Sequence, residues 1–219
     1  MSFALFSPHH SLADVLLGRL PRDTDGAHDL AHLVRVWRNV QTIAAVEDGD
    51  RELLLAATLL HDGVFVSIND PRRAQASRLA AEQARTILAG IGWQTSRIDA
   101  VAHAIEAHSF SARIAPRTLE ARVLQDADRL DALGALGVAR CFYTAGQMGS
   151  ALYDPLDPQA TDRALADQHF ALDHFETKLL TLAEGFQTAT GQQLAARRHA
   201  RLVAFREALL EEIGEGPAR

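Results

Sequence analysis

The sequence predicts an all-α protein. Apolar residues recur at three- and four-residue steps in several segments, helix-forming residues dominate, and no segment alternates apolar and polar residues as a half-buried strand does. The chain has 219 residues, 47% hydrophobic and 23% charged, which is the ordinary balance of a folded protein. We expect one domain over residues 1–219, because no linker or repeat interrupts the chain, and residues 146–160 offer the one candidate boundary.

The first two helices follow from their apolar patterns. In residues 28–47, apolar side chains form one helical stripe, which predicts an amphipathic helix. Residues 51–62 are apolar nearly all round, begin after Asp50 and stop before Gly63. Aspartate is a favoured N-cap residue, and a helix that is apolar all round is usually buried. We therefore expect this second helix at the centre of the domain.

Turn residues divide the remainder of the chain. Residues 63–75 are predicted to form a loop, and the Gly- and Pro-containing segment 146–160 is predicted to be irregular. The other predicted helices cover residues 78–89, 97–108, 117–133, 134–145, 161–183 with a break, and 188–213.

Composition excludes several classes of protein. The chain has 22 Lys and Arg against 28 Asp and Glu, a net charge of −6, so no general nucleic-acid binding is expected. The single cysteine, Cys141, excludes an intrachain disulfide and a Cys-rich zinc site. The longest mostly apolar run, residues 53–60, is far shorter than the roughly 20 residues of a membrane span. The first ten residues lack a signal-peptide pattern, so we expect a cytoplasmic protein without membrane partners.

Histidines in the predicted helices are candidates for a metal site. Five lie in the first half of the chain: His28, His32, His61, His103 and His108. A buried imidazole is costly without a partner, and a shared metal ion is one efficient partner. His61 and Asp62 end the most apolar helix, where joint coordination of one cation would satisfy both. The alternative is a buried His–Asp hydrogen-bond network that fixes the helices.

Five motifs carry a family resemblance. In chain order they are AHDLAHLVRVW, LAATLLHD, HAIEAHSFS, LQDADRLDALGALG and ALDHFETKLL, over about residues 27–180. Together they resemble the HD-domain metal-dependent phosphohydrolases, and more closely the small stand-alone bacterial members. The resemblance implies an orthogonal helical bundle of the HD-domain type. It also implies the metal ligands His32, His61, Asp62 and Asp128. Asp128 is preferred to Asp126 because the family's final ligand precedes the pattern Asp128-Arg-Leu-Asp-Ala-Leu.

The implied ligands form a site of nitrogen and oxygen donors without sulfur. Such a site suits Mn²⁺, with Mg²⁺, Fe²⁺, Ni²⁺ and Co²⁺ as alternatives. A divalent ion there would polarise a phosphoryl group and lower the pKa of water, so Asp62 counts as catalytic as well as a ligand. His103 and His108 are candidates to neutralise phosphate charge or to protonate the leaving oxygen. No glutamate directly follows Asp62, where some HD hydrolases carry a water-activating residue, so the general base is left open.

Three further residues are candidates for binding a substrate phosphate. His28 lies near a helix N-terminus, which itself favours anions. Arg129 follows the last implied ligand, and Lys178 is taken from the HFETKL match to the family. Each is a cation that more commonly lies on a solvated face, so these three assignments are weighed evenly against that alternative. Asp131 is expected to cap a helix or to pair locally.

The resemblance implies hydrolysis of a small phosphorylated substrate, namely a nucleoside triphosphate cleaved to monophosphate and pyrophosphate. One alternative is another reaction of the same fold: a 5′-nucleotidase, or a phosphodiesterase or hydrolase of cyclic nucleotides or (p)ppGpp. A second metal ion bound by His103 and His108, with Asp62 as bridge, would favour that alternative. The second alternative to the triphosphate cleavage is a non-catalytic nucleotide-sensing module. Helical faces in residues 188–213 also suggest a homodimer contact.

Overall fold

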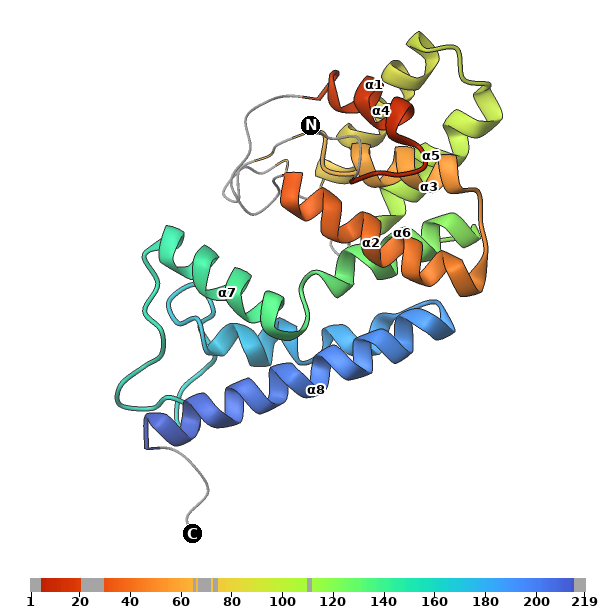
Figure 1. Cartoon of the computed structure of the whole chain (residues 1–219). Coiled ribbons are helices and arrows are strands. Elements are labelled where there is room, and N and C mark those ends of the chain that lie inside the picture. The colour runs from red at the N-terminus through yellow and green to blue at the C-terminus, as the bar shows by residue number, and fades with distance from the viewer. Residues whose placement is uncertain are drawn as a thin grey trace. The chain divides into compact units, whose positions relative to one another are not determined.

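The computed structural model describes residues 5–20, 30–64, 66, 72, 75–109 and 112–214. Within these ranges the regular structure is helical, and the one β-type pairing is an isolated parallel bridge between Ala151 and Phe170 (Figure 1). The predicted all-α fold is therefore confirmed. The chain divides into two compact units, residues 1–128 and 129–219, and each is described by itself. The expectation of a single domain over the whole chain stays a prediction.

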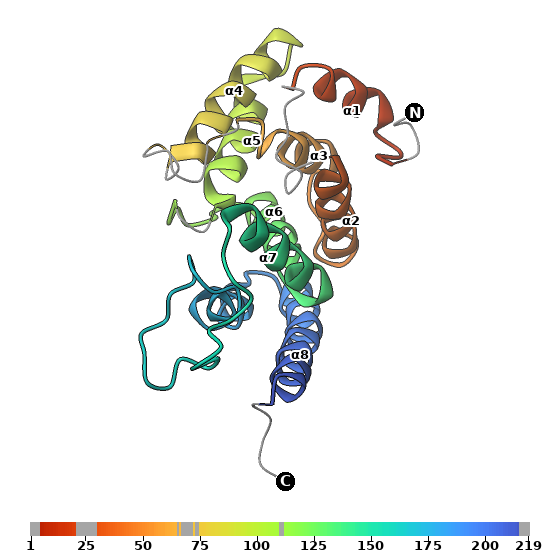
Figure 2. The same ribbon diagram turned by 90° about the vertical axis from the view of Figure 1, so that its left-hand side faces the viewer.

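The first unit is built around a buried central helix. Its helices are α1 (His10–Leu17), α2 (Leu30–Glu47), α3 (Arg51–Leu60), α4 (Ala76–Gly90), α5 (Thr95–His108) and α6 (Leu119–Leu130), the last of which continues two residues beyond the unit boundary. Helix α3 contacts α1, α2, α4 and α5, and all of residues 53–60 are buried (Figure 2). This is the central position that its uniformly apolar sequence predicts.

The start of α3 is fixed by the predicted cap. The Asp50 carboxylate accepts the backbone N–H groups of Glu52 and Leu53, each at 3.0 Å. These are two of the N–H groups that a helix leaves without intrahelical partners. Helix α1, by contrast, was not among the predicted helices. It has only eight residues, too few to display a helical repeat clearly.

The second unit contains a pair of long helices. They are α7 (Gly134–Met148) and α8 (Ala189–Glu212), which pack against each other, with the π-helix η2 (Phe175–Leu179) and the 3₁₀ helix η3 (Leu182–Gly185) between them in sequence. Asp131 is fully buried and accepts a hydrogen bond from Arg140 Nη1 at 2.5 Å. The local pairing expected of Asp131 is thus confirmed.

The predicted helix at residues 161–183 does not form as such. Residues 151–171 make turns and bends, and regular structure returns only in η2. The Asp157 carboxylate accepts the backbone N–H groups of Thr161 and Asp162, both at 2.9 Å, and Asp173 accepts that of Ala166 at 2.7 Å. The Ala166 N–H lies inside the predicted helix, which would have bonded it to a carbonyl oxygen, so its bond to Asp173 favours a turn instead. Within the described residues, no helix is long and apolar enough to cross a bilayer.

Candidate functional site

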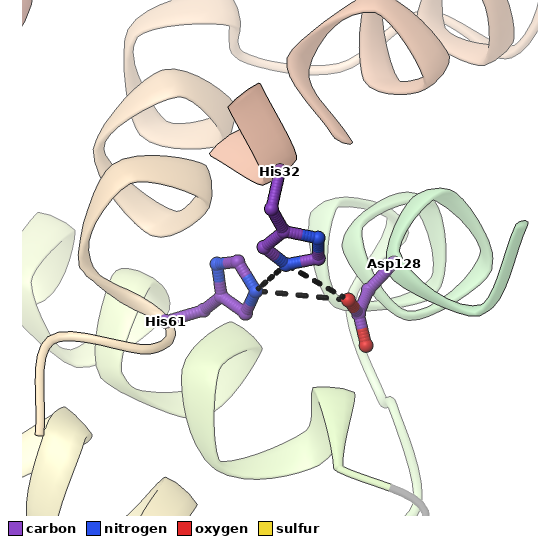
Figure 3. Close-up of side chains that lie close together, drawn as sticks. All are labelled: His32, His61 and Asp128. Atoms are coloured by element: carbon purple, nitrogen blue, oxygen red, sulfur yellow. Dashed lines mark hydrogen bonds and ion pairs between the residues drawn. The ribbon is translucent and has the colours of Figure 1, made fainter. Parts of the chain in front are cut away.

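Four side chains from three separated parts of the sequence meet in the first unit. His32 comes from α2, His61 and Asp62 follow the last residue of α3, and Asp128 lies in the last turn of α6. Figure 3 shows His32, His61 and Asp128 pointing toward one another. The two imidazoles are almost completely buried, whereas the Asp62 and Asp128 side chains are 31% and 26% exposed. Solvent therefore reaches the cluster from its carboxylate side.

The donor atoms have the spacing of ligands to one ion. The Nε2 atoms of His32 and His61 are 3.3 Å apart. Asp128 Oδ1 lies 3.6 Å from the first nitrogen and 3.7 Å from the second. Asp62 Oδ2 lies 3.5 and 3.3 Å from the same two atoms. Because protein nitrogen and oxygen ligands bind an ion such as zinc at about 2.0–2.2 Å, two ligands of one ion lie roughly 3–4 Å apart. His32, His61 and Asp128 therefore fit a single divalent cation, and Asp62 lies at ligand distance from both imidazole nitrogens.

Backbone hydrogen bonds orient two of the rings. His61 Nδ1 lies 2.7 Å from the carbonyl oxygen of Thr58, and His108 Nδ1 lies 2.5 Å from that of Ile105. A carbonyl oxygen only accepts, so Nδ1 carries the proton in both neutral rings, and each Nε2 presents a lone pair. A ring fixed in this way is typical of metal-bound histidine.

His108 joins the cluster from the end of α5. Its Nε2 lies 3.8 Å from Asp62 Oδ1, and its ring stands edge-on to that of His61 at 4.8 Å between centroids. His61, Asp62 and His108 thus form a second group of potential ligands that overlaps the group of His32, His61 and Asp128. The two oxygens of Asp62 face different partners, Oδ2 toward His61 and Oδ1 toward His108.

Three helices end at this cluster. His61 directly follows α3, His108 is the last residue of α5, and Asp128 is two residues from the end of α6. The C-terminal end of a helix carries a partial negative charge, because its last carbonyl oxygens have no intrahelical partner. Together with the two carboxylates, these ends make the cluster a favourable place for a cation.

The pKa values of the cluster reflect the same charge distribution. Burial disfavours protonation of His61, but the neighbouring carboxylates outweigh burial and raise its pKa well above the ordinary value, so without an ion His61 Nε2 carries a proton that a bound cation would displace. Burial alone would raise the pKa values of Asp62 and Asp128, yet the adjacent histidines lower both. Burial and the nearby His61 lower the pKa of His108. Both carboxylates are therefore ionised at neutral pH, as a metal ligand must be.

The other candidate residues lie elsewhere or outside the described structure. His103 is half-buried on α5, and its Nε2 accepts the backbone N–H of Arg117 at 3.0 Å. In the second unit, Arg129 Nη1 donates to the carbonyl oxygen of Gly185 at 2.7 Å, and Lys178 is exposed on η2. His28 falls outside the described residues. The roles assigned to these four residues stay predictions, as do those of the clustered residues.

Two buried amides near the cluster were not singled out from the sequence. Asn39 Nδ2 donates to the carbonyl oxygen of Ala127 at 2.9 Å, and Gln125 Nε2 donates to that of Ala107 at 2.6 Å. Asn39 has a weak signal in the sequence, since it lies inside the apolar stripe of α2, where a polar residue needs a partner. Gln125 has no such signal in the sequence, because the polar residues that follow it do not indicate a buried position.

Comparisons with known proteins agree with this fold. Residues 29–133 match the HD domain family. The chain is 33% identical over 195 residues to the uncharacterised protein YpgQ of Bacillus subtilis, covering 87% of each chain. A crystal structure of selenomethionine YpgQ superposes with a TM-score of 0.72 at 30% identity, covering 93% of this chain and 96% of that one.

Two further solved structures are similar over nearly their full length. One is YpgQ described as a complex with ADP, with a TM-score of 0.71, 29% identity and coverage of 97% and 98%. The other is an HD-superfamily hydrolase from Bacillus thuringiensis, with a TM-score of 0.70, 28% identity and coverage of 93% and 97%. The family expected from the motifs is therefore confirmed, and the chain belongs to the HD-domain family of the HD-superfamily hydrolases.

Proposed function

We propose that this protein is a metal-dependent phosphohydrolase that cleaves a nucleoside triphosphate to the monophosphate and pyrophosphate. The observation that carries the proposal is the convergence of His32, His61, Asp62 and Asp128: the two imidazole Nε2 atoms lie 3.3 Å apart, and each carboxylate places an oxygen 3.3–3.7 Å from both of them. A purely structural His–Asp network would not need two carboxylates that are partly open to solvent. This exposure would let a substrate reach the cluster from solvent.

The four residues would hold a divalent ion, for which Mn²⁺ is our candidate because the donors are imidazole nitrogens and carboxylate oxygens without sulfur. When bound, such an ion withdraws electron density from a phosphoryl oxygen and makes water a better nucleophile. The His61–Thr58 hydrogen bond keeps Nε2 of His61 directed at the cluster. The low pKa of both carboxylates keeps them charged.

His108 is the candidate for proton transfer. Its Nδ1 proton is committed to the Ile105 carbonyl oxygen, so Nε2 of the neutral ring is a proton acceptor. That nitrogen lies 3.8 Å from Oδ1 of Asp62, a carboxylate that is partly open to solvent. It can take a proton from the attacking water and return it to the leaving oxygen.

The nucleotide part of the proposal rests on the relatives. A structure of YpgQ, which is similar over nearly its whole length, is described as a complex with ADP. A nucleotide carries several phosphate charges that need cationic partners. His28, Arg129 and Lys178 remain our candidates for those contacts, and His103, whose Nε2 accepts the Arg117 N–H, is a candidate through its Nδ1–H.

The overlapping ligand groups support a second candidate reaction. Asp62 presents one oxygen to His61 and the other to His108, as a carboxylate that bridges two ions would. A site with two ions is suited to clamping both oxygens of a phosphodiester displacement. A metal content near two ions per chain would favour a phosphodiesterase, and a content near one would favour the pyrophosphohydrolase.

Phosphate release from a panel of nucleotides with Mn²⁺, measured with and without added pyrophosphatase, tests the proposal. The protein is compared with Asp62→Asn and with the control Asp99→Asn, which removes an exposed charge on α5 that pairs with Arg85. We expect signal only with pyrophosphatase, lost in Asp62→Asn and kept in Asp99→Asn. Direct phosphate release would contradict pyrophosphate formation and indicate a nucleotidase. No release from any nucleotide would overturn the nucleotide assignment.

A further inference from the structure

Two buried amide side chains connect the helices that carry the candidate ligands. Asn39 on α2 is 7% exposed, and its Nδ2 donates to the carbonyl oxygen of Ala127 on α6 at 2.9 Å. Gln125 on α6 is 3% exposed, and its Nε2 donates to the carbonyl oxygen of Ala107 on α5 at 2.6 Å. In both cases the accepting residue directly precedes a residue of the cluster, namely Asp128 or His108.

The accepting carbonyl groups belong to the last turns of two helices. Ala127 lies in the last four residues of α6, and Ala107 in the last four of α5. The helix hydrogen-bond ladder ends at a last turn, so its carbonyl oxygens are the ones most open to a donor from elsewhere, and each carbonyl oxygen can accept two hydrogen bonds. The two amides supply such donors from a neighbouring helix. They therefore fix the position and the rotation of the ends of α6 and α5, where Asp128 and His108 lie, relative to the neighbouring helix.

We propose that Asn39 and Gln125 are positioning residues for Asp128 and for His108, respectively. The inference rests on the proposed metal site. Asn39 lies seven residues after His32, two turns along α2. The same face of α2 therefore carries the ligand His32 and the amide that bonds to the backbone next to the ligand Asp128. Removal of the Asn39 amide frees the last turn of α6 to shift relative to His32. Because a functional site tolerates displacements of its ligands of only about 0.5 Å, such a shift lowers the affinity of the site for the ion.

Gln125 acts on a different partner. Its amide holds the α5 end, and His108 is the next residue after the acceptor. Loss of this hydrogen bond moves the His108 ring away from Asp62 and leaves the four-residue ligand set in place. The two amides thus make separable contributions, one to ion affinity and the other to proton transfer.

Titration calorimetry with Mn²⁺ tests the role of Asn39. The variant is Asn39→Leu, which has a similar volume and no amide, and its control is Val40→Ala, which removes buried volume from the next position of α2. Circular dichroism establishes that each variant is folded at the temperature used. We expect the Mn²⁺ Kd of Asn39→Leu to rise roughly 10- to 100-fold, which is the usual effect of removing a residue that orients a metal ligand. The Mn²⁺ Kd of Val40→Ala should change less than about twofold.

The outcomes separate this inference from the proposed function. If the unmodified protein binds Mn²⁺ and Asn39→Leu shifts the Kd no more than Val40→Ala does, the positioning role of Asn39 is wrong and the metal site stands. If the unmodified protein binds no Mn²⁺ or other divalent ion, the proposed function fails and the inference fails with it.

Nuclear magnetic resonance of the histidine rings tests Gln125. In Gln125→Met we expect the ring signals of His108 to shift while those of His32 keep their positions, with kcat lowered and the Mn²⁺ Kd within about threefold of the unmodified value. Unchanged His108 signals, or a Kd that rises as much as in Asn39→Leu, would show that Gln125 does not act through His108.

Discussion

The Nδ1–H of His61 donates to the carbonyl oxygen of Thr58, three residues earlier, at 2.7 Å. His108 makes the same bond to Ile105, also three residues earlier, at 2.5 Å. Each ring thus takes its orientation from the end of the helix it belongs to, and each bond pairs a carbonyl of a last turn. The same contact that completes the helix also aims the Nε2 lone pair at the cluster. Here folding and ligand geometry depend on one hydrogen bond.

Mn²⁺ should stabilise the protein against unfolding. An ion that binds only the folded state at 100 times its Kd adds about 2.7 kcal/mol to the free energy of unfolding. We expect this increase in the unmodified protein and in His10→Ala, which changes an exposed histidine on α1, and its loss in His61→Ala. Urea unfolding with and without Mn²⁺ measures it. Equal stabilisation of all three proteins would contradict binding at His61.

His103 and His108 should differ in their effect on turnover. His108 Nε2 faces Asp62, so we expect His108→Gln to lower kcat by roughly 10²–10⁴-fold, the range of a lost acid–base group. His103 Nε2 already accepts the Arg117 backbone N–H, so His103→Gln should change KM more than kcat. Steady-state kinetics on the best nucleotide compares the two variants. Equal losses of kcat would show that both rings serve the reacting phosphate.

The Asp50 cap should contribute to stability through its hydrogen bonds more than through its charge. Asp50 caps α3 and also lies 3.1 Å from Arg97. We expect Asp50→Ala to cost about 1 kcal/mol of unfolding free energy, and Asp50→Asn, which keeps the capping oxygen, to cost less than half of that. Urea unfolding followed by tryptophan fluorescence reports on this unit, because Trp37 and Trp93 both lie in it. A larger loss in Asp50→Asn would assign the effect to the ion pair.

The sequence was most informative where one physical cause dominated. The uniformly apolar pattern of α3 and its Asp50 cap each have a single interpretation, and both are found in the structure. The four candidate ligands came from motif order and the family resemblance, and their convergence in space is a property of the folded chain. The orientation of His61 could not be predicted, because its partner is a backbone carbonyl group that carries no sequence signal.

The sequence was misleading where side chains compete with the backbone. Residues 161–174 contain good helix formers, yet the Asp173 carboxylate captures the N–H group of Ala166, which a helix would have bonded to a carbonyl oxygen. Whether a carboxylate bonds to the backbone or faces solvent depends on tertiary contacts. For Asp173 the decisive contact is Arg163, ten residues away, and helical periodicity does not reveal it.

This Arg163–Asp173 contact predicts an acid-sensitive contribution to stability. The Arg163 guanidinium donates to both Asp173 oxygens, at 2.5 and 2.9 Å, and the Ala166 N–H donates a third bond. These bonds outweigh burial and lower the pKa of Asp173. A carboxyl group whose pKa is lower in the folded than in the unfolded chain stabilises the fold above its unfolded pKa, about 3.9 for aspartate. The stabilisation is lost as the pH falls below about 4 toward the folded pKa.

Comparison with Asp173→Asn isolates this contribution, because the acid-sensitive groups of the metal cluster are common to both proteins. We expect the difference in unfolding free energy between the two proteins to be constant from pH 7 to about pH 5 and to shrink below about pH 4. Urea unfolding followed by circular dichroism measures the difference, since this signal includes the helices of the second unit. A difference that stays the same down to pH 3 would show that the pair contributes through packing and not through the charge of Asp173.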